Sequence, residues 1–347
     1  MLAGGQGTRL RPLTVHTPKP VVPIFERPFL HYQLDLLKRV PEIDEVILSL
    51  NYQPRTIEDV FGDGTDAGVR LRYVVEPAPL GTGGAIRYAA QGITGTVVVF
   101  NSDVLTSIDI AAVVQRHRER NAKATIVLTP VDNPTAYGLV ETDASGNIRR
   151  FLEKPSANEI TCNTVNAGIY VLETDTFDRI PEHEPYSIER GYFPSLVERG
   201  ETFVSYLYDG YWIDIGTPEK YVQVHRDIMA GRCRTPPFTG ASDEVWVSPR
   251  ARVDDGAFLQ GPCFIDDGAV VMSGATVGPY SVIGKQCHVE VDARVQQSIL
   301  WANTRVCAGA TVTNAVLGRH CHVGRHASVA AHAVIGDKTV LTDYSRS

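Results

Sequence analysis

The stretch Ile265-Asp-Asp-Gly-Ala-Val-Val271-Met-Ser-Gly-Ala-Thr-Val277-Gly-Pro-Tyr-Ser-Val-Ile283 establishes the fold of the last third of the chain. An aliphatic residue recurs here every six residues, and a small residue follows it four positions later. Such a repeat is typical of a parallel β-helix, whose stacked coils bury one aliphatic and one small side chain per short strand. We therefore predict a β-helix domain over residues 245–342, followed by a tail at 343–347.

The repeat extends well beyond this stretch. It begins at Val247, shifts its frame through Leu300, Val306 and Val312, resumes at Leu317 and ends at Leu341. Three cysteines occupy the small slot, and we interpret them as interior packing residues rather than metal ligands: Cys263, Cys287 and Cys321. A metal site or an acyl-transfer histidine is a minor alternative for the nearby histidines, because solenoid faces usually carry solvated side chains: His288, His320, His322, His326 and His332.

The first 232 residues have a different texture and are separated from the repeat by a predicted linker at 233–244. Short β-rich runs alternate with helical patterns, and the clearest runs are 45–50, 70–75, 96–100 and 124–128. The last two runs are nearly all apolar, as expected for strands buried on both faces of a mostly parallel sheet. This alternation predicts a doubly wound, Rossmann-like α/β domain that binds its ligand at the carboxyl ends of the strands.

A glycine-rich segment begins the chain, Leu2-Ala-Gly-Gly-Gln-Gly-Thr-Arg-Leu-Arg-Pro-Leu-Thr14, and Pro18-Lys-Pro20 follows. Its glycines allow the backbone to approach a ligand closely, while Arg9, Lys19 and the loop amides offer positive charge and N–H donors. The segment lacks the Gly-Lys-Ser/Thr of a P-loop and the glycine spacing of a dinucleotide fingerprint. It predicts a polyphosphate cradle of another kind.

This segment resembles the signature of the sugar-1-phosphate nucleotidyltransferases, and later motifs extend the resemblance over the whole chain. The resemblance implies a β-helix of the left-handed kind and attack of a sugar-1-phosphate on the α-phosphorus of a nucleoside triphosphate. Members of this family carry a central strand ahead of Leu-Ala-Gly-Gly. Because this chain starts at Met1, we expect that strand to be curtailed and the natural start to lie upstream.

The resemblance also implies the site residues. Arg9 and Lys19 would stabilise the triphosphate during transfer, and Asp103 and Asp214 would hold Mg²⁺, which prefers carboxylates, phosphates and water. Taken alone, Asp103 could instead be a residue of a strand-end turn, and Asp214 is better explained as a turn residue than as a ligand. Further nucleotide contacts are implied for Leu2, Ala3, Gly4, Gly5, Gly7, Thr8, Glu76, Pro79, Gly81, Thr82 and Ser102. Sugar-phosphate contacts are implied for Gly138, Glu153, Lys154, Asn166, Gly168 and Glu189.

Glu76 bears on the choice of base. A carboxylate accepts two hydrogen bonds and so suits guanine, whereas uracil and thymine offer one N–H between acceptor carbonyls. The alternative is a solvent-exposed Glu76 and a base read by backbone groups alone. Pro185-Tyr-Ser-Ile-Glu-Arg190 resembles a stretch of mannose-1-phosphate guanylyltransferases, which favours GTP and mannose-1-phosphate. Glucose-1-phosphate or another sugar-1-phosphate with GTP, UTP, dTTP or ATP remains open, as does a non-catalytic regulatory subunit.

Composition and net charge exclude some classes of binding partner. The chain has 347 residues, a net charge of −7 and no apolar run of transmembrane length, so we expect neither nucleic-acid nor membrane binding. Its six cysteines include no Cys-x-x-Cys pair, which favours a reduced, cytoplasmic setting. The long faces of the β-helix predict a homo-oligomer, either a dimer or a tetramer.

Overall fold

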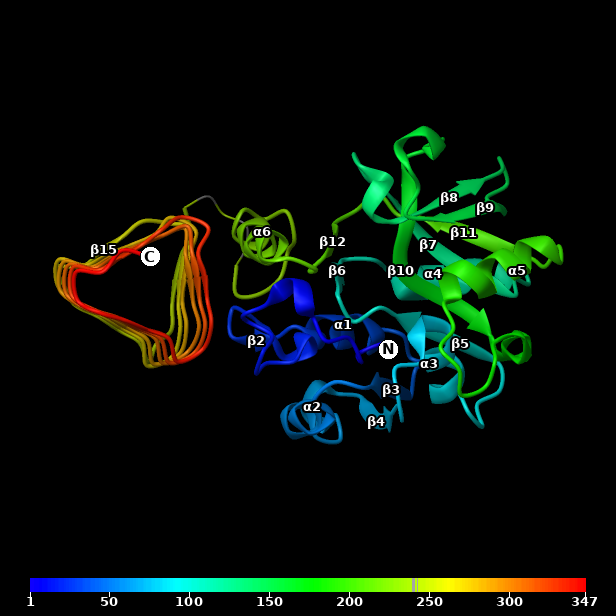
Figure 1. Ribbon diagram of the computed structural model, residues 1–347, viewed down its shortest axis with the longest axis horizontal. Coiled ribbons are helices and arrows are strands. Elements are labelled where there is room, and N and C mark those ends of the chain that lie inside the picture. The colour runs from blue at the N-terminus through cyan, green and yellow to red at the C-terminus, as the bar shows by residue number, and fades with distance from the viewer. Residues whose placement is uncertain (239–240, 242) are drawn as a thin grey trace. The chain divides into compact units, whose positions relative to one another are not determined.

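The computed structural model describes residues 1–238, 241 and 243–347, so part of the predicted linker at 233–244 lies outside the described residues. The chain forms two compact units. Met1–Gln6 and Leu30–Trp212 make up the sheet unit, whereas Gly7–Phe29 and Ile213–Ser347 make up the β-helix unit. Both units are drawn in Figure 1. The predicted domain boundary at residue 232 stays a prediction.

The sheet unit confirms the Rossmann-like fold. Strands β3 (Glu45–Leu50) and β4 (Arg70–Val75) are parallel, and so are β7 (Ala124–Pro130) and β11 (Phe203–Leu207). Strand β10 (Thr164–Glu173) runs antiparallel between β7 and β5 (Thr96–Phe100). The hairpin of β8 (Gly138–Thr142) and β9 (Ile148–Glu153) extends this sheet through β8, which pairs with β10.

The helices of this unit are α1 (Leu30–Leu37), α2 (Pro54–Phe61), α3 (Gly81–Ala89), α4 (Ile110–Glu119) and α5 (Phe193–Glu198). Asp109 caps α4 by accepting hydrogen bonds from the N–H groups of Ala111 and Ala112, which explains where that helix begins. Helix α4 packs on β7, β10 and β11, and its buried face includes Val113 and His117.

A cavity of about 360 Å³ lies between β3 and β5. Across this gap the described residues are bridged only by Leu2, which pairs in parallel with Ser49 and Asn101. Apolar side chains such as Ile47 and Val98 line the cavity. The first residues of β5 are therefore partly exposed, although the sequence predicts burial on both faces. Burial lowers the pKa of the Met1 ammonium group to about 5.

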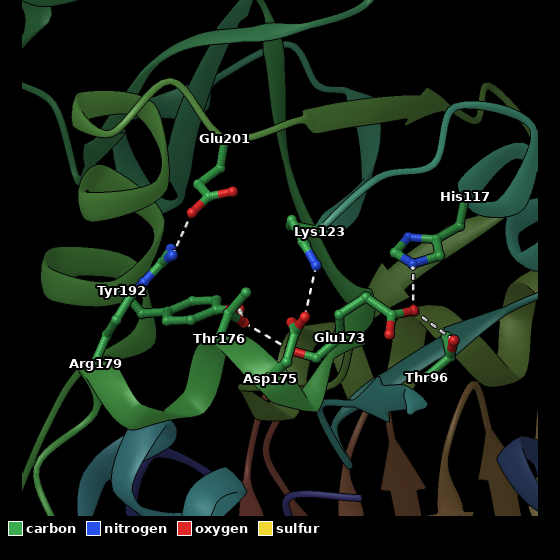
Figure 2. Close-up of polar contacts among 9 residues, drawn as sticks. All are labelled: Thr96, His117, Lys123, Glu173, Asp175, Thr176, Arg179, Tyr192 and Glu201. Carbon is green, nitrogen blue, oxygen red and sulfur yellow. Dashed lines mark hydrogen bonds and ion pairs between the residues drawn. The ribbon is translucent and has the colours of Figure 1, made fainter. Parts of the chain in front are cut away.

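A polar network lies at the edge of the sheet where β5 and β7 begin (Figure 2). His117 is 2% exposed, and its ring contacts the Thr125 hydroxyl at 2.9 Å and the Glu173 carboxylate at 3.1 Å. Lys123 pairs with Asp175 at 2.6 Å. Because Asp103 follows the opposite end of β5, this network stabilises the sheet at the end away from the predicted site.

The β-helix unit confirms the hexapeptide prediction. Its strands form three parallel sheets, which appear end-on as a triangle in Figure 1. The first sheet contains β13 (Val245–Val247), β16 (Cys263–Ile265), β19 (Ser281–Ile283), β22 (Ile299–Leu300), β25 (Val316–Leu317) and β28 (Val334–Ile335). The second contains β14 (Arg252–Val253), β17 (Val270–Val271), β20 (His288–Val289), β23 (Arg305–Val306), β26 (His322–Val323) and β29 (Val340–Leu341). The third contains β15 (Phe258–Leu259), β18 (Thr276–Val277), β21 (Arg294–Gln296), β24 (Thr311–Thr313) and β27 (Ser328–Val329).

The aliphatic and small slots form the interior of these coils, as predicted. Cys263 and Cys287 are 0% exposed and Cys321 is 2% exposed, so all three pack inside, and all six cysteines are free thiols. The frame shift at Leu300 keeps the interior ladder intact, because Leu300 pairs with Ile283 and Leu317. The described residues include no cluster of three or more His, Cys, Asp or Glu side chains able to hold a metal.

The first sheet differs from the other two because its outward side chains are also apolar. They form a ladder, in register, of Trp246, Phe264, Val282, Ile299, Val316 and Val334. Two segments of the same unit contact the coils near this sheet: α6 (Pro218–Met229), whose Tyr221 hydroxyl accepts a hydrogen bond from the Trp301 indole, and the hairpin of β1 (Pro23–Ile24) and β2 (Arg27–Pro28). At the tip of this hairpin, the ring of Phe25 lies 5.2 Å from the ring of Phe264.

Two further short strands are β6 (Val104–Thr106) and β12 (Trp212–Asp214). No helix among the described residues is long and apolar enough to cross a membrane.

Candidate active site

The predicted phosphate cradle is shared by the two units. Its residues up to Gln6 belong to the sheet unit, and its residues from Gly7 onward belong to the β-helix unit. Gly7 has a φ of 60°, a conformation that favours glycine, and a Cβ there would lie 3.1 Å from the Thr14 side chain. The Thr14 hydroxyl donates a 2.7 Å hydrogen bond to the Gly7 carbonyl. The resulting tight turn starts a 3-10 helix, Thr8–Leu10, in which Arg9 is exposed while Leu10 is buried.

Asp214 lies close to Arg9 in the same unit. A Cβ placed on Gly216 would lie 3.1 Å from both the Arg9 guanidinium and the Asp214 carboxylate, so the two charged groups flank this glycine. Lys220 forms an ion pair with Asp214. Thr217 caps α6 by accepting a hydrogen bond from the Lys220 N–H at 3.4 Å, which explains where that helix begins. The structure thus brings Arg9, Asp214 and an unpredicted lysine together.

Asp103 lies in the sheet unit, in the turn between β5 and β6. Gln33 of α1 is 1% exposed and fixes this turn, because its side-chain amide donates to the carbonyls of Asn101 at 2.9 Å and Val104 at 2.7 Å. The Ser102 N–H donates to the Leu2 carbonyl at 3.2 Å, which joins two predicted nucleotide contacts. Sequence reasoning missed Gln33, since a buried polar residue on a helix has no periodic signal.

Glu76 is 9% exposed, so its carboxylate does not point into solvent. One oxygen accepts a hydrogen bond from the Ser49 hydroxyl at 3.0 Å, and the other accepts one from the Leu80 N–H at 3.0 Å. A Cβ on Gly4 would lie 3.3 Å from the first oxygen. Gly4 and Glu76 are therefore neighbours, and the carboxylate is held in one orientation with acceptor capacity left over.

The loop after Glu76 packs against residues 184–188. The N–H of Gly83 donates to the Tyr186 carbonyl at 2.8 Å, and a Cβ on Gly81 would lie 2.8 Å from that oxygen. These glycines are therefore needed for close packing. The Thr82 hydroxyl donates to Glu189 at 2.7 Å, so this predicted nucleotide contact lies beside a predicted sugar contact.

The other predicted sugar-phosphate residues gather around β8, β9 and β10. A Cβ on Gly138 would lie 3.0 Å from the Glu153 carboxylate. Burial raises the pKa of Glu153, and the nearby charge of Glu189 raises it further. The Asn166 side chain donates to the hydroxyl of buried Tyr170 at 2.9 Å and accepts from the Gly168 N–H at 2.8 Å. Tyr170, which sequence reasoning missed, thus orients Asn166.

The remaining predicted residues are more accessible. Lys154 is exposed and has a φ of 53°, with its N–H bonded to the Tyr137 carbonyl at 2.9 Å. Pro79 is exposed, and a Cβ on Gly5 would meet nothing within 4 Å. Lys19 begins a 3-10 helix, Lys19–Val21, and is partly exposed. Exposed charges and an open glycine loop leave these groups accessible to a ligand.

Comparison with known proteins identifies the family. The chain matches a family model described as nucleotidyl transferase over residues 1–231 and one described as GMPPB C-terminal domain over residues 259–345. A mannose-1-phosphate guanylyltransferase of Mycobacterium tuberculosis is 38% identical over 316 residues, which cover 90% of this chain and 82% of that protein. A UTP–glucose-1-phosphate uridylyltransferase of Synechocystis is 31% identical, over 92% of this chain and 87% of that protein.

Solved structures similar to this chain include two of one protein. The crystal structure of HddC from Yersinia pseudotuberculosis superposes with a TM-score of 0.55 at 29% identity, over 64% of this chain and 95% of that one. A second structure of HddC, in complex with GMP-PN, has the same TM-score at 28% identity and the same coverage. The matched sequence, the Rossmann-like sheet and the β-helix together place this chain in the nucleotidyl transferase family.

Proposed function

We propose that this chain converts GTP and mannose-1-phosphate to GDP-mannose and pyrophosphate. The observation that carries the proposal is that several relatives of this chain are named mannose-1-phosphate guanylyltransferase or probable mannose-1-phosphate guanylyltransferase. They include the mycobacterial protein and one from Oryza sativa, which is 33% identical over 93% of this chain. In the reaction, a phosphate oxygen of the sugar attacks the α-phosphorus of GTP. The bond between the α-phosphorus and the bridging oxygen breaks, and pyrophosphate leaves with that electron pair.

Charge neutralisation is the main demand of this reaction, since no protein nucleophile takes part. We assign Arg9 to the departing pyrophosphate and Lys19 to the triphosphate near the α-phosphate. The exposed position of Arg9 beside Asp214 supports its role, because a guanidinium on a surface loop can meet phosphate oxygens with two N–H groups.

We assign Asp103 and Asp214 to a divalent cation, with Mg²⁺ as our choice. The donor chemistry supports this assignment, because Mg²⁺ prefers one or two carboxylates together with phosphates and water. Asp214 already pairs with a cation, the Lys220 ammonium group, so its surroundings accept positive charge. The ion, when bound, would neutralise phosphate charge.

The assignments of the base and of the sugar rest on residues of the sheet unit, namely Glu76 for the base and the residues around β8, β9 and β10 for the sugar phosphate. Glu76 would accept hydrogen bonds from guanine N1–H and its exocyclic amine, which its fixed and buried carboxylate supports. Gly138, Glu153, Lys154, Asn166, Gly168 and Glu189 would bind the sugar-1-phosphate. Among these, Glu153 and Asn166 present oxygen and nitrogen atoms suited to sugar hydroxyls.

A pyrophosphate-release assay on the full chain tests the proposal. With GTP, mannose-1-phosphate and Mg²⁺ we expect turnover that a chelator abolishes. Asp214→Asn should lower the rate about a hundredfold or more, whereas Asp59→Asn on the exposed face of α2 should not change it. Glu76→Gln should reduce the preference for GTP over ITP, which lacks the exocyclic amine, by roughly tenfold or more; the exposed Glu198→Gln is its control. Wild-type turnover with glucose-1-phosphate and UTP alone would favour the uridylyltransferase alternative.

The assembly and location of the protein stay predictions. We propose a dimer or tetramer joined through the β-helix, in the cytoplasm. Light scattering on the purified chain would test the assembly, and a monomer at micromolar concentration would contradict it.

A further inference from the structure

The loop that carries Arg9 and Lys19 belongs to the β-helix unit. Residues Gly7–Phe29 form one compact body with Ile213–Ser347, so the two proposed phosphate-binding cations share a unit with the coils. A solenoid that served assembly alone would not need to hold this loop. The contacts between the coils and the loop therefore bear on what the β-helix does.

Arg319, in the turn after β25, makes the most direct contact with the loop. Its guanidinium donates a 2.6 Å hydrogen bond to the hydroxyl of Thr17, which is 3% exposed and lies two residues before Lys19. The guanidinium carbon lies 4.9 Å from the centre of the Trp301 ring. The Arg319 N–H donates to Asp337 at 2.7 Å, which fixes the backbone from which the side chain extends.

A second connection reaches the loop on the other side of Lys19. The indole N–H of Trp301 donates to the Tyr221 hydroxyl at 2.8 Å, and that hydroxyl donates to the Pro23 carbonyl at 2.5 Å. Trp301 and Tyr221 are both 0% exposed, so these hydrogen bonds are shielded from water. The loop is thus held at Thr17 and at Pro23, and Lys19 lies between the two anchors.

Arg319 also acts on a titratable group at the tip of the β1–β2 hairpin, the carboxyl of Glu26. Burial raises the pKa of the Glu26 carboxyl to about 7, and the positive charge of Arg319 opposes that shift. Lys285 and Asp266 also face this carboxyl, which lies next to Gly284. Arg319 therefore contributes a hydrogen bond and a charge to the same loop, while its guanidinium packs on Trp301 of the coils.

We propose that Arg319 is a positioning residue, through which the β-helix holds Lys19 in the orientation that the transfer reaction requires. The proposal rests on the proposed function for the role of Lys19. A planar guanidinium can stack on an indole and donate to a hydroxyl at the same time, whereas an ammonium group cannot reproduce both contacts. Loss of Arg319 would remove the anchor at Thr17 and leave the one at Pro23, so Lys19 would be held from one side only.

The test measures kcat and KM separately for each substrate in Arg319→Ala, Arg319→Lys, Thr17→Val and the Arg319/Thr17 double variant. Arg305→Ala is the matched control, since Arg305 is an exposed arginine that pairs with Glu290 within the coils. We expect Arg319→Ala to lower kcat about tenfold or more, with KM for the sugar phosphate changed less than about twofold. The lysine variant should be intermediate. The double variant should match Arg319→Ala, because both single changes remove one shared contact.

Amide hydrogen exchange gives a readout that does not depend on activity. The N–H groups of Val21 and Val22 are hydrogen-bonded to the carbonyls of Pro18 and Lys19. They should exchange faster in Arg319→Ala and Thr17→Val but not in Arg305→Ala, while β7 of the sheet unit stays protected. Unchanged exchange together with wild-type kcat would overturn the proposal, as would fully additive effects in the double variant. An inactive wild type would instead count against the proposed function, and exchange would still test the anchor.

Discussion

His225 makes the stability of the β-helix unit depend on pH. It lies in α6, is 2% exposed, and donates from Nδ1 to the Tyr221 carbonyl at 2.8 Å. Its Nε2 accepts the Phe25 N–H at 3.4 Å, so the neutral ring satisfies both neighbours. Burial lowers the pKa of His225 from 6.5 to about 4. A proton on this ring would have no acceptor and would break the contact with Phe25.

The sign and size of the effect follow from the two pKa values. The folded pKa lies below the unfolded value, so the unfolded chain binds the proton more readily. The contribution of the neutral His225 ring to the free energy of unfolding is complete above pH 6.5 and is lost as the pH falls from 6.5 toward 4. The full difference of 6.5 − 4 = 2.5 corresponds to about 3 kcal/mol, of which about 1.4 kcal/mol is lost by pH 5.5.

Urea unfolding at pH 7.5 and pH 5.5 measures this contribution. His225→Gln keeps a donor and an acceptor but does not titrate, so its stability should fall less between the two pH values, by about 1.4 kcal/mol, than that of the wild type. His183→Gln, which alters an exposed histidine, should behave as the wild type does. An equal loss in wild type and His225→Gln would refute the argument that this ring is neutral because it is buried.

Three further predictions concern stability. Burial raises the folded pKa of Glu26 to about 7, above its unfolded value, so the contribution of this carboxyl to the free energy of unfolding is present at low pH and is lost as the pH rises from 4.5 to 7. In urea titrations, Glu26→Gln should therefore lose less stability than the wild type between pH 5 and pH 8. Gly84→Ala would place a Cβ 2.7 Å from the Glu184 carbonyl and should cost roughly 1–3 kcal/mol in thermal unfolding, whereas Gly5→Ala meets nothing and should cost little. A four-residue apolar strand added before Met1 should raise the melting temperature, because it would enter the cavity between β3 and β5 and remove the buried ammonium group; an unchanged Tm, or an equal rise with a charged strand, would contradict this.

The parts of the fold that repeat or alternate could be predicted from the sequence. A buried slot must recur in every coil, so Val271 and Ala275 identified the β-helix, and apolar runs such as 124–128 identified central strands. The ladder from Trp246 to Val334 is visible in the same repeat, and its outward apolar residues could have indicated a covered face.

Contacts between distant residues could not be predicted in this way. Arg319 and Thr17 are 302 residues apart, and no period connects them. For Glu76, residue type suggested a hydrogen-bond acceptor, but only the fold places Ser49 and the Leu80 N–H against it. Lys220 is the third residue of α6, where its partner Asp214 precedes the helix, so the sequence showed an ordinary helical lysine.

A competition assay tests the central claim most directly. The full chain would be given ATP, GTP, CTP, UTP and dTTP together, with equal amounts of mannose-, glucose- and galactose-1-phosphate and Mg²⁺, and the nucleotide sugars would be identified by mass and chromatography. The account predicts that GDP-mannose is the main product. A main product carrying uridine, thymidine or adenosine, or GDP joined mainly to another sugar, would contradict it.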